Sequence, residues 1–277
     1  MLVRGTLAVK TGYRETDLPS TMTQLAFPLN GAERFVLYED RPEYHLLLLN
    51  IPPDNRFTPD TIPAILQAVT YIRTKGDPKP LITTSTTPKF FSNGLDYETA
   101  VRTPGFFDQH YYPLMRVFLE FPWPTVALVN GHAFAAGFMI AECHDYIVMN
   151  PSKGFLCMNE LAFGAPLMGP LMSIFRVRFG TQTTHRITLT AHRFTAQEAL
   201  EAGLITAKGG LTEAESIAKR VAKLSESPSY GAIRKELFRE VIRDLKSYDS
   251  EALERAENEK FEDDFYNKIA GTLKSKI

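Results

Sequence analysis

The sequence predicts an α/β fold in which short strands alternate with helices, followed by a C-terminal region of helices. Three observations predict it. A chain of 277 residues, 44% of them hydrophobic, is long enough to bury a sizeable core. Short β-rich runs alternate with stretches of helical spacing, a pattern typical of strands joined by crossover helices. After Thr195 the spacing is almost wholly helical.

The pattern divides the chain into three segments. Residues 1–32 are expected to be an irregular extension, 33–210 the α/β core, and 211–277 the helical region. The expected strands are 35–38, 44–50, 81–85, 125–130, 146–149 and 155–158, and the expected helices are 59–73, 106–121 and one starting near 137. In the helical region, one apolar stripe must face either this core or another subunit; it consists of Tyr230, Ile233, Leu237, Val241 and Leu245.

Composition excludes several classes of protein. The net charge of -1 gives no overall attraction to nucleic acid or to an acidic membrane, so neither is an expected partner. No apolar run approaches the roughly 20 residues that cross a bilayer, so no membrane span is expected. The two cysteines, Cys143 and Cys157, form no CxxC pair, and the six histidines form no ligand pair. We therefore expect no disulfide framework and no metal site.

Both ends of the chain bear on its location. Ser275-Lys276-Ile277 differs by one conservative change from the peroxisomal address Ser-Lys-Leu, which predicts import into peroxisomes by the receptor for that address. Residues 1–14 carry three basic residues and no acid, as in a transit peptide, although acids follow at once. Mitochondrion and cytoplasm are therefore the alternative locations.

Two glycine-containing turns follow expected strands, at 89–96 (KFFSNGLD) and 129–137 (VNGHAFAAG). The signatures GxSxG, GxGxxG, HExxH and the P-loop do not occur. If a helix begins near Gly137, its first amides are unpaired and lie at the positive end of the helix dipole. Spacing alone leaves two interpretations open: a donor site for developing negative charge, or close packing of a helix on a sheet.

A family resemblance bears on this choice. Residues 125–133 (TVALVNGHA), then Ala135-Ala136-Gly137 and Asp145-Tyr146, resemble the signature of the crotonase superfamily, which includes enoyl-CoA hydratases and isomerases. Segments 90–96 and 195–205 resemble further elements of that family, in the same order along the chain. Within the family, 144–146 (HDY) and 155–160 (FLCMNE) are most similar to the enoyl-CoA delta isomerases.

The resemblance implies a spiral of ββα units with a helical C-terminal region that oligomerises as a homotrimer or hexamer. It also implies an oxyanion hole, formed by the backbone N–H groups of Leu95 and Ala136, for the thioester oxygen of an acyl-CoA substrate. Preorganised donors of this kind contribute on the order of 3 kcal/mol each in comparable sites. No metal or redox cofactor is implied.

Many hydratases of the family use two glutamates to activate water. The first position falls here on Met139, whose thioether cannot accept a proton from water, and the second falls on Glu160. A single carboxylate is the pattern of the isomerase branch, in which one base moves a proton between C2 and C4. The resemblance therefore implies an enoyl-CoA delta isomerase that converts 3-enoyl-CoA to 2-enoyl-CoA in fatty-acid degradation, with Glu160 as its catalytic group.

The surroundings of Glu160 are expected to be apolar. We expect Met139, Phe138 and Phe163 to line the substrate pocket and to raise the pKa of Glu160 toward neutrality. Glu142, one helical turn after Met139, is either a second acid from a shifted position or an ion-paired structural residue.

Two alternative functions remain at this stage. One is a hydratase or dehydratase acting on a specialised acyl-CoA, with Glu142 or another acid in place of the missing glutamate. The other is a noncatalytic acyl-CoA-binding protein. Acyl chain length and double-bond geometry depend on the shape of the pocket, particularly on residues 98–121, and the sequence does not fix that shape.

Overall fold

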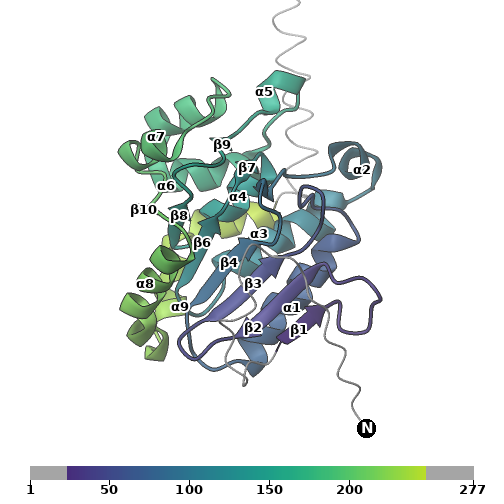
Figure 1. Ribbon diagram of the computed structural model, residues 1–277. Helices are drawn as coiled ribbons and strands as arrows, with labels where there is room; N and C mark the ends of the chain where they lie inside the picture. The colour runs from purple at the N-terminus through teal and green to yellow at the C-terminus, as the bar shows by residue number, and fades with distance from the viewer. Residues whose placement is uncertain (1–23, 248–277) are drawn as a thin grey trace, which may run out of the picture.

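The strands form two sheets, with helices on both sides of the larger one, so the α/β class predicted from sequence is confirmed (Figure 1). The computed structural model describes residues 24–247. In that part, the larger sheet has seven strands: β1 (Gln24–Phe27), β2 (Val36–Asp40), β3 (His45–Leu49), β4 (Leu81–Ser85), β6 (Thr125–Val129), β8 (Tyr146–Met149) and β10 (Ala207–Lys208). The smaller sheet has three: β5 (Phe90–Ser92), β7 (His132–Phe134) and β9 (Leu156–Cys157).

From β4 onward, consecutive strands alternate between the larger and the smaller sheet. Each of β4, β6 and β8 in the larger sheet is followed by a short turn and then by β5, β7 or β9 in the smaller one. All strand pairs from β3 onward are parallel, whereas β1, β2 and β3 pair antiparallel. Asn130, in the turn after β6, contacts the turn after β4: its side-chain amide donates to the carbonyls of Ser85 and Thr87 at 3.2 and 3.1 Å. The repeated strand–strand–helix unit is the expected ββα spiral.

Helices follow these strand pairs and then continue to the end of the described chain. Their bounds are α1 (Thr61–Lys75), α2 (Tyr97–Arg102), the π-helical turn η2 (Phe107–Tyr111), α3 (Tyr112–Leu119), α4 (Ala136–Glu142), α5 (Glu160–Phe163), α6 (Gly169–Thr188), α7 (Ala196–Glu201), α8 (Leu211–Val221), the 3-10 turn η3 (Ala222–Glu226) and α9 (Tyr230–Leu237). A further helical stretch covers 239–247. Gly180, at φ +67, divides α6 into two helical parts.

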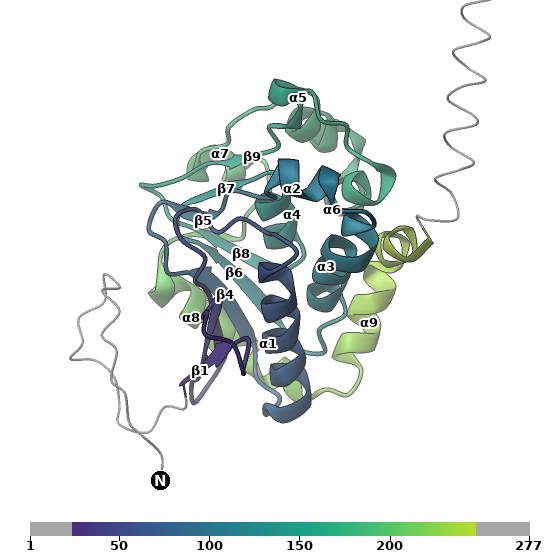
Figure 2. The same cartoon turned by 90° about the vertical axis from the view of Figure 1, so that its right-hand side faces the viewer.

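Both faces of the larger sheet are covered, because side chains alternate along each strand. In β3, Leu47 and Leu49 belong to the main core with α1, α3 and α4, while Leu46 and Leu48 pack on the other side with α8. Figure 2 shows α1 and α3 on one side of the sheet and α8 on the other. Strand β3, buried on both sides, is therefore a run of leucines after His45 and shows no alternation of apolar and polar residues.

Three expectations need correction. Strand β1 lies inside the segment expected to be irregular, where it pairs antiparallel with β2, so the sheet begins before residue 33. Helix α8, beyond the expected boundary at 210, covers one face of the sheet and is part of the core. The long helix α6 and the two-residue strand β10 were not predicted; β10 is too short to show a periodicity.

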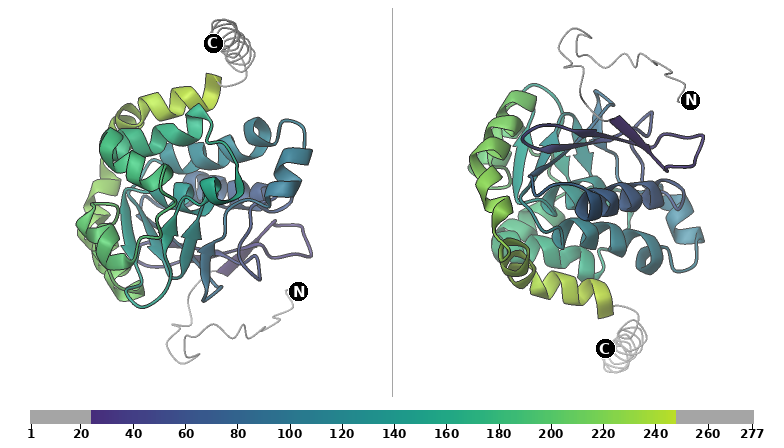
Figure 3. Two further views of the ribbon diagram at one scale, coloured as in Figure 1. Left: turned by 90° about the horizontal axis from the view of Figure 1, so that it is seen from above. Right: turned by 90° about the horizontal axis from the view of Figure 1, so that it is seen from below.

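The C-terminal apolar stripe is divided between two environments. Val241 and Leu245 are buried in the core, whereas Ile233 and Leu237 on α9 are 68% and 67% exposed. Seen from above and below, α8, η3 and α9 run along one side of the molecule (Figure 3). Among residues 24–247, no helix is both long and apolar enough to span a membrane.

Candidate active site

A cavity of about 340 Å³ lies at the carboxyl ends of the three strands of the smaller sheet. The chain reaches it just after β5, β7 and β9, and the ends of parallel strands are where open α/β sheets bind ligands. The remaining wall comes from Arg56, from α2, η2 and α4, and from the stretch between α5 and the start of α6. The lining residues are Arg56, Asn93, Leu95, Tyr97, Phe107, Tyr111, Ala135, Ala136, Met139, Asn159, Glu160, Phe163, Ala165, Pro166, Leu167, Met168 and Leu171.

Leu95 and Ala136 both line this cavity. Their turns are in contact: a Cβ atom added to Gly94, whose φ is +84°, would come 3.2 Å from the Ala136 nitrogen. The Leu95 turn is fixed to Phe57, whose N–H donates to the Gly94 carbonyl at 2.8 Å. Within the described residues, neither the Leu95 nor the Ala136 amide donates to a backbone carbonyl. Two donors that are free for a ligand therefore lie next to each other.

The direction of the Ala136 amide depends on an unusual residue before it. Ala135 is the N-cap of α4 and has φ 50 and ψ -123, a conformation that a residue with a Cβ rarely adopts. Such backbone strain costs on the order of 1–3 kcal/mol and persists only where neighbouring structure enforces it. Ala135 is held by its own N–H, which donates to the Cys157 carbonyl in β9 at 2.8 Å. Helix α4 therefore begins at a strained residue, and both Ala135 and Ala136 line the cavity.

Glu160 is the first residue of α5 and lines the same cavity. The residue is 8% exposed, and its Oε2 atom is buried with no hydrogen-bond partner among the described residues. Burial raises the pKa of Glu160 to about 7, an effect opposed only by a hydrogen bond from its own backbone N–H. The carboxyl group can therefore both accept and release a proton near neutral pH.

The other expected pocket residues differ in position. Met139 lines the cavity and is buried, as expected. Phe163 also lines it, but at the surface: it is 49% exposed and meets the Tyr97 ring edge-on at 5.4 Å between centroids. It therefore contributes less to the desolvation of Glu160 than the sequence suggested.

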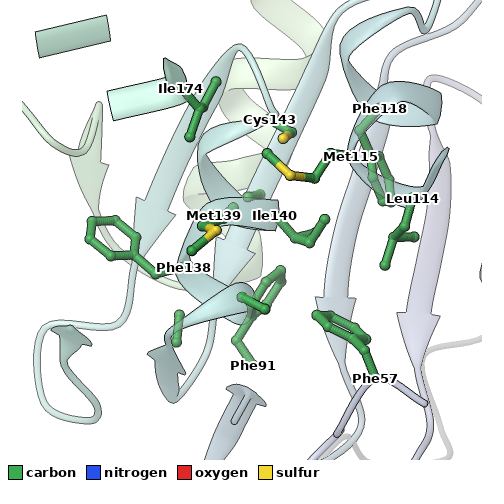
Figure 4. Close-up of a cluster of buried hydrophobic side chains, with 14 of the residues drawn as sticks. Phe57, Phe91, Leu114, Met115, Phe118, Phe138, Met139, Ile140, Cys143 and Ile174 are labelled. Carbon is green, nitrogen blue, oxygen red and sulfur yellow. The ribbon is translucent and has the colours of Figure 1, made fainter. Parts of the chain in front are cut away.

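The expectation for Phe138 was wrong. Its side chain is fully buried in the core, where its ring lies 5.3 Å from that of Phe175, and it does not line the cavity. The physical reason is the helix geometry, since neighbouring residues on a helix point about 100° apart and Met139 already faces the cavity. Figure 4 shows Phe138 and Ile140 leaving α4 on opposite sides.

Glu142 does not reach the cavity either. It is fully buried and pairs with Arg178 of α6, with 2.7 Å between its Oε2 and the Arg178 Nε. Burial raises the pKa of Glu142 to about 7, against the opposing effect of the Arg178 guanidinium. Of the two interpretations from sequence, the ion-paired structural residue is the one that the structure supports.

Several lining residues were not singled out from sequence. Tyr111 is fully buried on η2, and Asn159 has its Oδ1 atom buried without a hydrogen-bond partner among the described residues. Arg56 is ion-paired with Asp54, with 3.0 Å between Nε and Oδ2. The sequence predicts that residues 98–121 shape the pocket, but it does not predict which of their side chains line it. In the part of the chain that the structure describes, no group of three or more His, Cys, Asp or Glu residues could hold a metal ion.

The fold and this site define a protein of the crotonase type. Residues 45–266 match the family Enoyl-CoA hydratase/isomerase, and the chain belongs to that family. Similar relatives include peroxisomal enoyl-CoA delta isomerase 2 of Arabidopsis thaliana, 30% identical over 73% of this chain and 92% of the relative. A putative enoyl-CoA hydratase of Thermus thermophilus is 31% identical over 70% of this chain and 79% of the relative.

Solved structures agree on the fold. An apo enoyl-CoA isomerase of Mycobacterium tuberculosis superposes with a TM-score of 0.70 at 21% identity, covering 77% of this chain and 95% of the other. An enoyl-CoA hydratase of Bacillus halodurans superposes with a TM-score of 0.67 at 20% identity, covering 77% of this chain and 90% of the other. Isomerases and hydratases thus share this fold, and the reaction must be argued from the site.

Proposed function

We propose that this protein is an enoyl-CoA delta isomerase that converts 3-enoyl-CoA to 2-enoyl-CoA. The observation that carries the proposal is the cavity itself: Glu160 has a buried oxygen, Oε2, without a hydrogen-bond partner among the described residues, and Leu95 and Ala136 line the same cavity. By the family resemblance, Met139 stands at the position of the other glutamate of hydratases. The delta isomerases of Arabidopsis thaliana among the similar relatives support it.

In the proposed reaction the thioester oxygen of the acyl-CoA accepts hydrogen bonds from the amides of Leu95 and Ala136. The Glu160 carboxylate removes a proton from C2, and the electron pair delocalises over the thioester and the 3,4 double bond as a dienolate. The protonated Glu160 then returns the proton to C4, so that the double bond lies between C2 and C3. Atoms and charge balance without a metal or a redox cofactor, and the amides stabilise the charge where it develops.

Among the described residues that line the cavity, Glu160 is the only carboxylate, which favours isomerisation over hydration. Addition of water to a double bond needs a group that positions the water and takes its proton, and the Met139 thioether cannot take one. Its apolar side chain instead keeps the neighbourhood of Glu160 dry, which protects a dienolate from protonation by solvent.

Location and assembly are parts of the same proposal. Two of the similar isomerases of Arabidopsis thaliana are peroxisomal by name, which supports a peroxisomal location. The tripeptide Ser275-Lys276-Ile277 lies outside the described residues. A homotrimer or hexamer would cover the exposed side chains of Ile233 and Leu237 on α9.

The proposal is tested with the purified full-length protein and cis- and trans-3-enoyl-CoA esters in water enriched in oxygen-18. We expect the absorbance of a conjugated 2-enoyl thioester to appear and the product to show no gain in mass. In Glu160→Gln the rate should fall by about 10²–10⁴-fold, because the general base is lost while the amides remain.

A matched variant serves as the control. Glu98→Gln changes an exposed glutamate on α2 that does not line the cavity, and it should keep the isomerase rate within a few-fold. A hydrated product that carries oxygen-18 would replace the proposal with hydratase activity. Binding of the thioesters without any turnover would leave an acyl-CoA-binding protein.

A further inference from the structure

Tyr111 lies in the cavity but has no role in the reaction proposed above. It ends the π-helical turn η2, in which the Tyr112 N–H donates to the Phe107 carbonyl five residues earlier. A π-helical turn holds an extra residue and is found frequently at functional sites. Here both ends of the turn, Phe107 and Tyr111, line the cavity, and the Tyr111 side chain is fully buried.

The Tyr111 hydroxyl contacts the first turn of α4 at two points. It donates to the Ala136 carbonyl at 3.0 Å, and it lies 3.5 Å from the Met139 sulfur, one helical turn further on. These contacts join η2 to the residue whose N–H is the proposed oxyanion donor. Because Ala135 before it is strained, the position of the Ala136 amide depends on restraints from outside the helix.

The Tyr111 hydroxyl is suited to act as a permanent hydrogen-bond donor. Burial raises the pKa of Tyr111 well above its ordinary value of 10.0, with further contributions from Cys143 and Glu160. The phenol therefore stays neutral at any working pH and keeps its proton for the Ala136 carbonyl. A buried carbonyl in the first turn of a helix accepts such a bond without losing its bond inside the helix, because it has two lone pairs.

We propose that Tyr111 is a positioning residue that holds the Ala136 amide in the direction needed to stabilise the enolate oxygen. The inference rests on the proposed function, because it assigns Tyr111 a task in the oxyanion hole of that reaction. The hydroxyl acts through the backbone of α4 and does not touch the reacting atoms. A small misplacement of a preorganised donor lowers the rate more than it lowers substrate binding.

The test compares Tyr111→Phe with Tyr44→Phe. Tyr44 is also a buried tyrosine, but it does not line the cavity, and its hydroxyl donates to Glu215 Oε1 at 2.5 Å. Two quantities are measured: kcat and KM with 3-enoyl-CoA, and the absorption shift of bound 2,4-hexadienoyl-CoA. The absorption of this conjugated thioester moves to longer wavelength when its carbonyl oxygen accepts strong hydrogen bonds. Thermal melting reports folding of each variant.

We expect Tyr111→Phe to bind the dienoyl thioester as the unchanged protein does, but with a smaller absorption shift. Its kcat should fall about tenfold to a hundredfold with KM nearly unchanged. Tyr44→Phe, outside the cavity, should keep the kcat, KM and absorption shift of the unchanged protein. Replacement of Tyr111 by 4-aminophenylalanine, which restores a donor on the ring, should recover part of the shift and of kcat.

Four other outcomes would overturn one or both proposals. An unchanged shift and kcat in Tyr111→Phe would overturn the positioning role, as would a lower melting temperature accompanied by no change in kcat. If the unchanged protein hydrates its substrate and Tyr111→Phe reduces the absorption shift, the isomerase proposal fails and the positioning role stands. If the unchanged protein gives no shift with the bound thioester, both fail.

Discussion

At the scale of single residues, the acid–base properties of Glu160 follow from its surroundings. Its carboxyl group is buried beside Met139 and has no cationic partner among the residues described, so burial alone raises its pKa to about 7. A catalytic group with a pKa near the working pH is present in useful amounts as both base and acid. Burial of the Glu160 Oε2 atom without a hydrogen-bond partner lowers the stability of the fold, and such buried unpaired groups are typical of functional sites.

This pKa predicts the pH dependence of the reaction. Removal of a proton from C2 requires the carboxylate, which is the minor form of Glu160 below pH 7. We expect kcat/KM for 3-enoyl-CoA to level off above about pH 7 and to fall about tenfold per pH unit below it. Initial rates between pH 5.5 and 9 measure this, and a kcat/KM that stays level down to pH 5.5 would contradict it.

The free energy of unfolding provides an independent test of the raised pKa of Glu160. The folded-state pKa of Glu160 lies above the unfolded value, so its protonation favours the folded state, and this contribution is lost as pH rises from about 4.5 through 7. Glu160→Gln should therefore match the unchanged protein at pH 4.5 and exceed its free energy of unfolding at pH 8. Equal stabilities at pH 8 would mean that the carboxyl group is well solvated.

At the scale of elements, close packing of α4 on β5 positions the site. A Cβ atom added to Gly137 would come 2.5 Å from the Ser92 carbonyl oxygen and 2.8 Å from the Ser92 Cβ. The Ser92 hydroxyl in turn accepts a hydrogen bond from the Gly94 N–H at 3.1 Å. A shift of α4 is thus transmitted to the turn that carries Leu95, so the two amide donors depend on one contact.

Gly137→Ala tests this contact. We expect it to lower stability by about 1–3 kcal/mol, a typical effect of overpacking, and to lower kcat more than thioester binding. Differential scanning calorimetry and steady-state kinetics measure the two effects. Gly210→Ala, before α8, is the matched control, because a Cβ atom there meets nothing within 4 Å. Wild-type kcat in Gly137→Ala would show that the amides tolerate movement of α4.

The same elements show what could be predicted from sequence. Strands 81–85 and 146–149 were predicted with the bounds that the structure has, since each is a compact apolar or β-branched run between turns. The expected helix 106–121 is instead a π turn followed by α3, because hydrophobic spacing does not distinguish i+5 from i+4 hydrogen bonding. The direction of Tyr111 therefore could not be predicted.

For the site, the prediction depended on backbone motifs. The family resemblance of the turns around Gly94 and Gly137 implied which amides form the oxyanion hole, and in the structure the Gly94 turn lies against Ala136. Side-chain direction was less predictable: Phe138 and Met139 are neighbours in sequence, yet only Met139 faces the cavity. Arg178, the ion-pair partner of Glu142, lies on α6, a helix that no sequence pattern predicted.

At the scale of the whole molecule, one buried arginine joins the C-terminal helices to the core. Arg234 on α9 is 3% exposed and donates to the Leu119 carbonyl at 2.8 Å and, through Nη1, to the Phe118 carbonyl. Its other nitrogens donate to the Cys143 carbonyl at 2.7 Å and to Asp145 Oδ1 at 2.5 Å. These carbonyls end α3 and α4, where the helix dipoles favour a cation.

Arg234→Met tests how much of the fold depends on this residue. Methionine keeps an unbranched apolar side chain but leaves the Asp145 carboxylate and the carbonyls of two helix ends without their donor. Loss of one partner of a buried ion pair costs about 3–5 kcal/mol. We expect a loss of that size in the free energy of unfolding, measured by urea denaturation with an unchanged slope. Arg239→Met, at a 71% exposed arginine paired with Glu236, is the control and should change stability by less than about 1 kcal/mol.

Because α3 follows the η2 turn of the cavity and α4 carries Ala136, Arg234→Met should also lower kcat at temperatures where the variant is fully folded. An unchanged kcat there would mean that the amino ends of α3 and α4 keep their positions when the carboxyl ends are released.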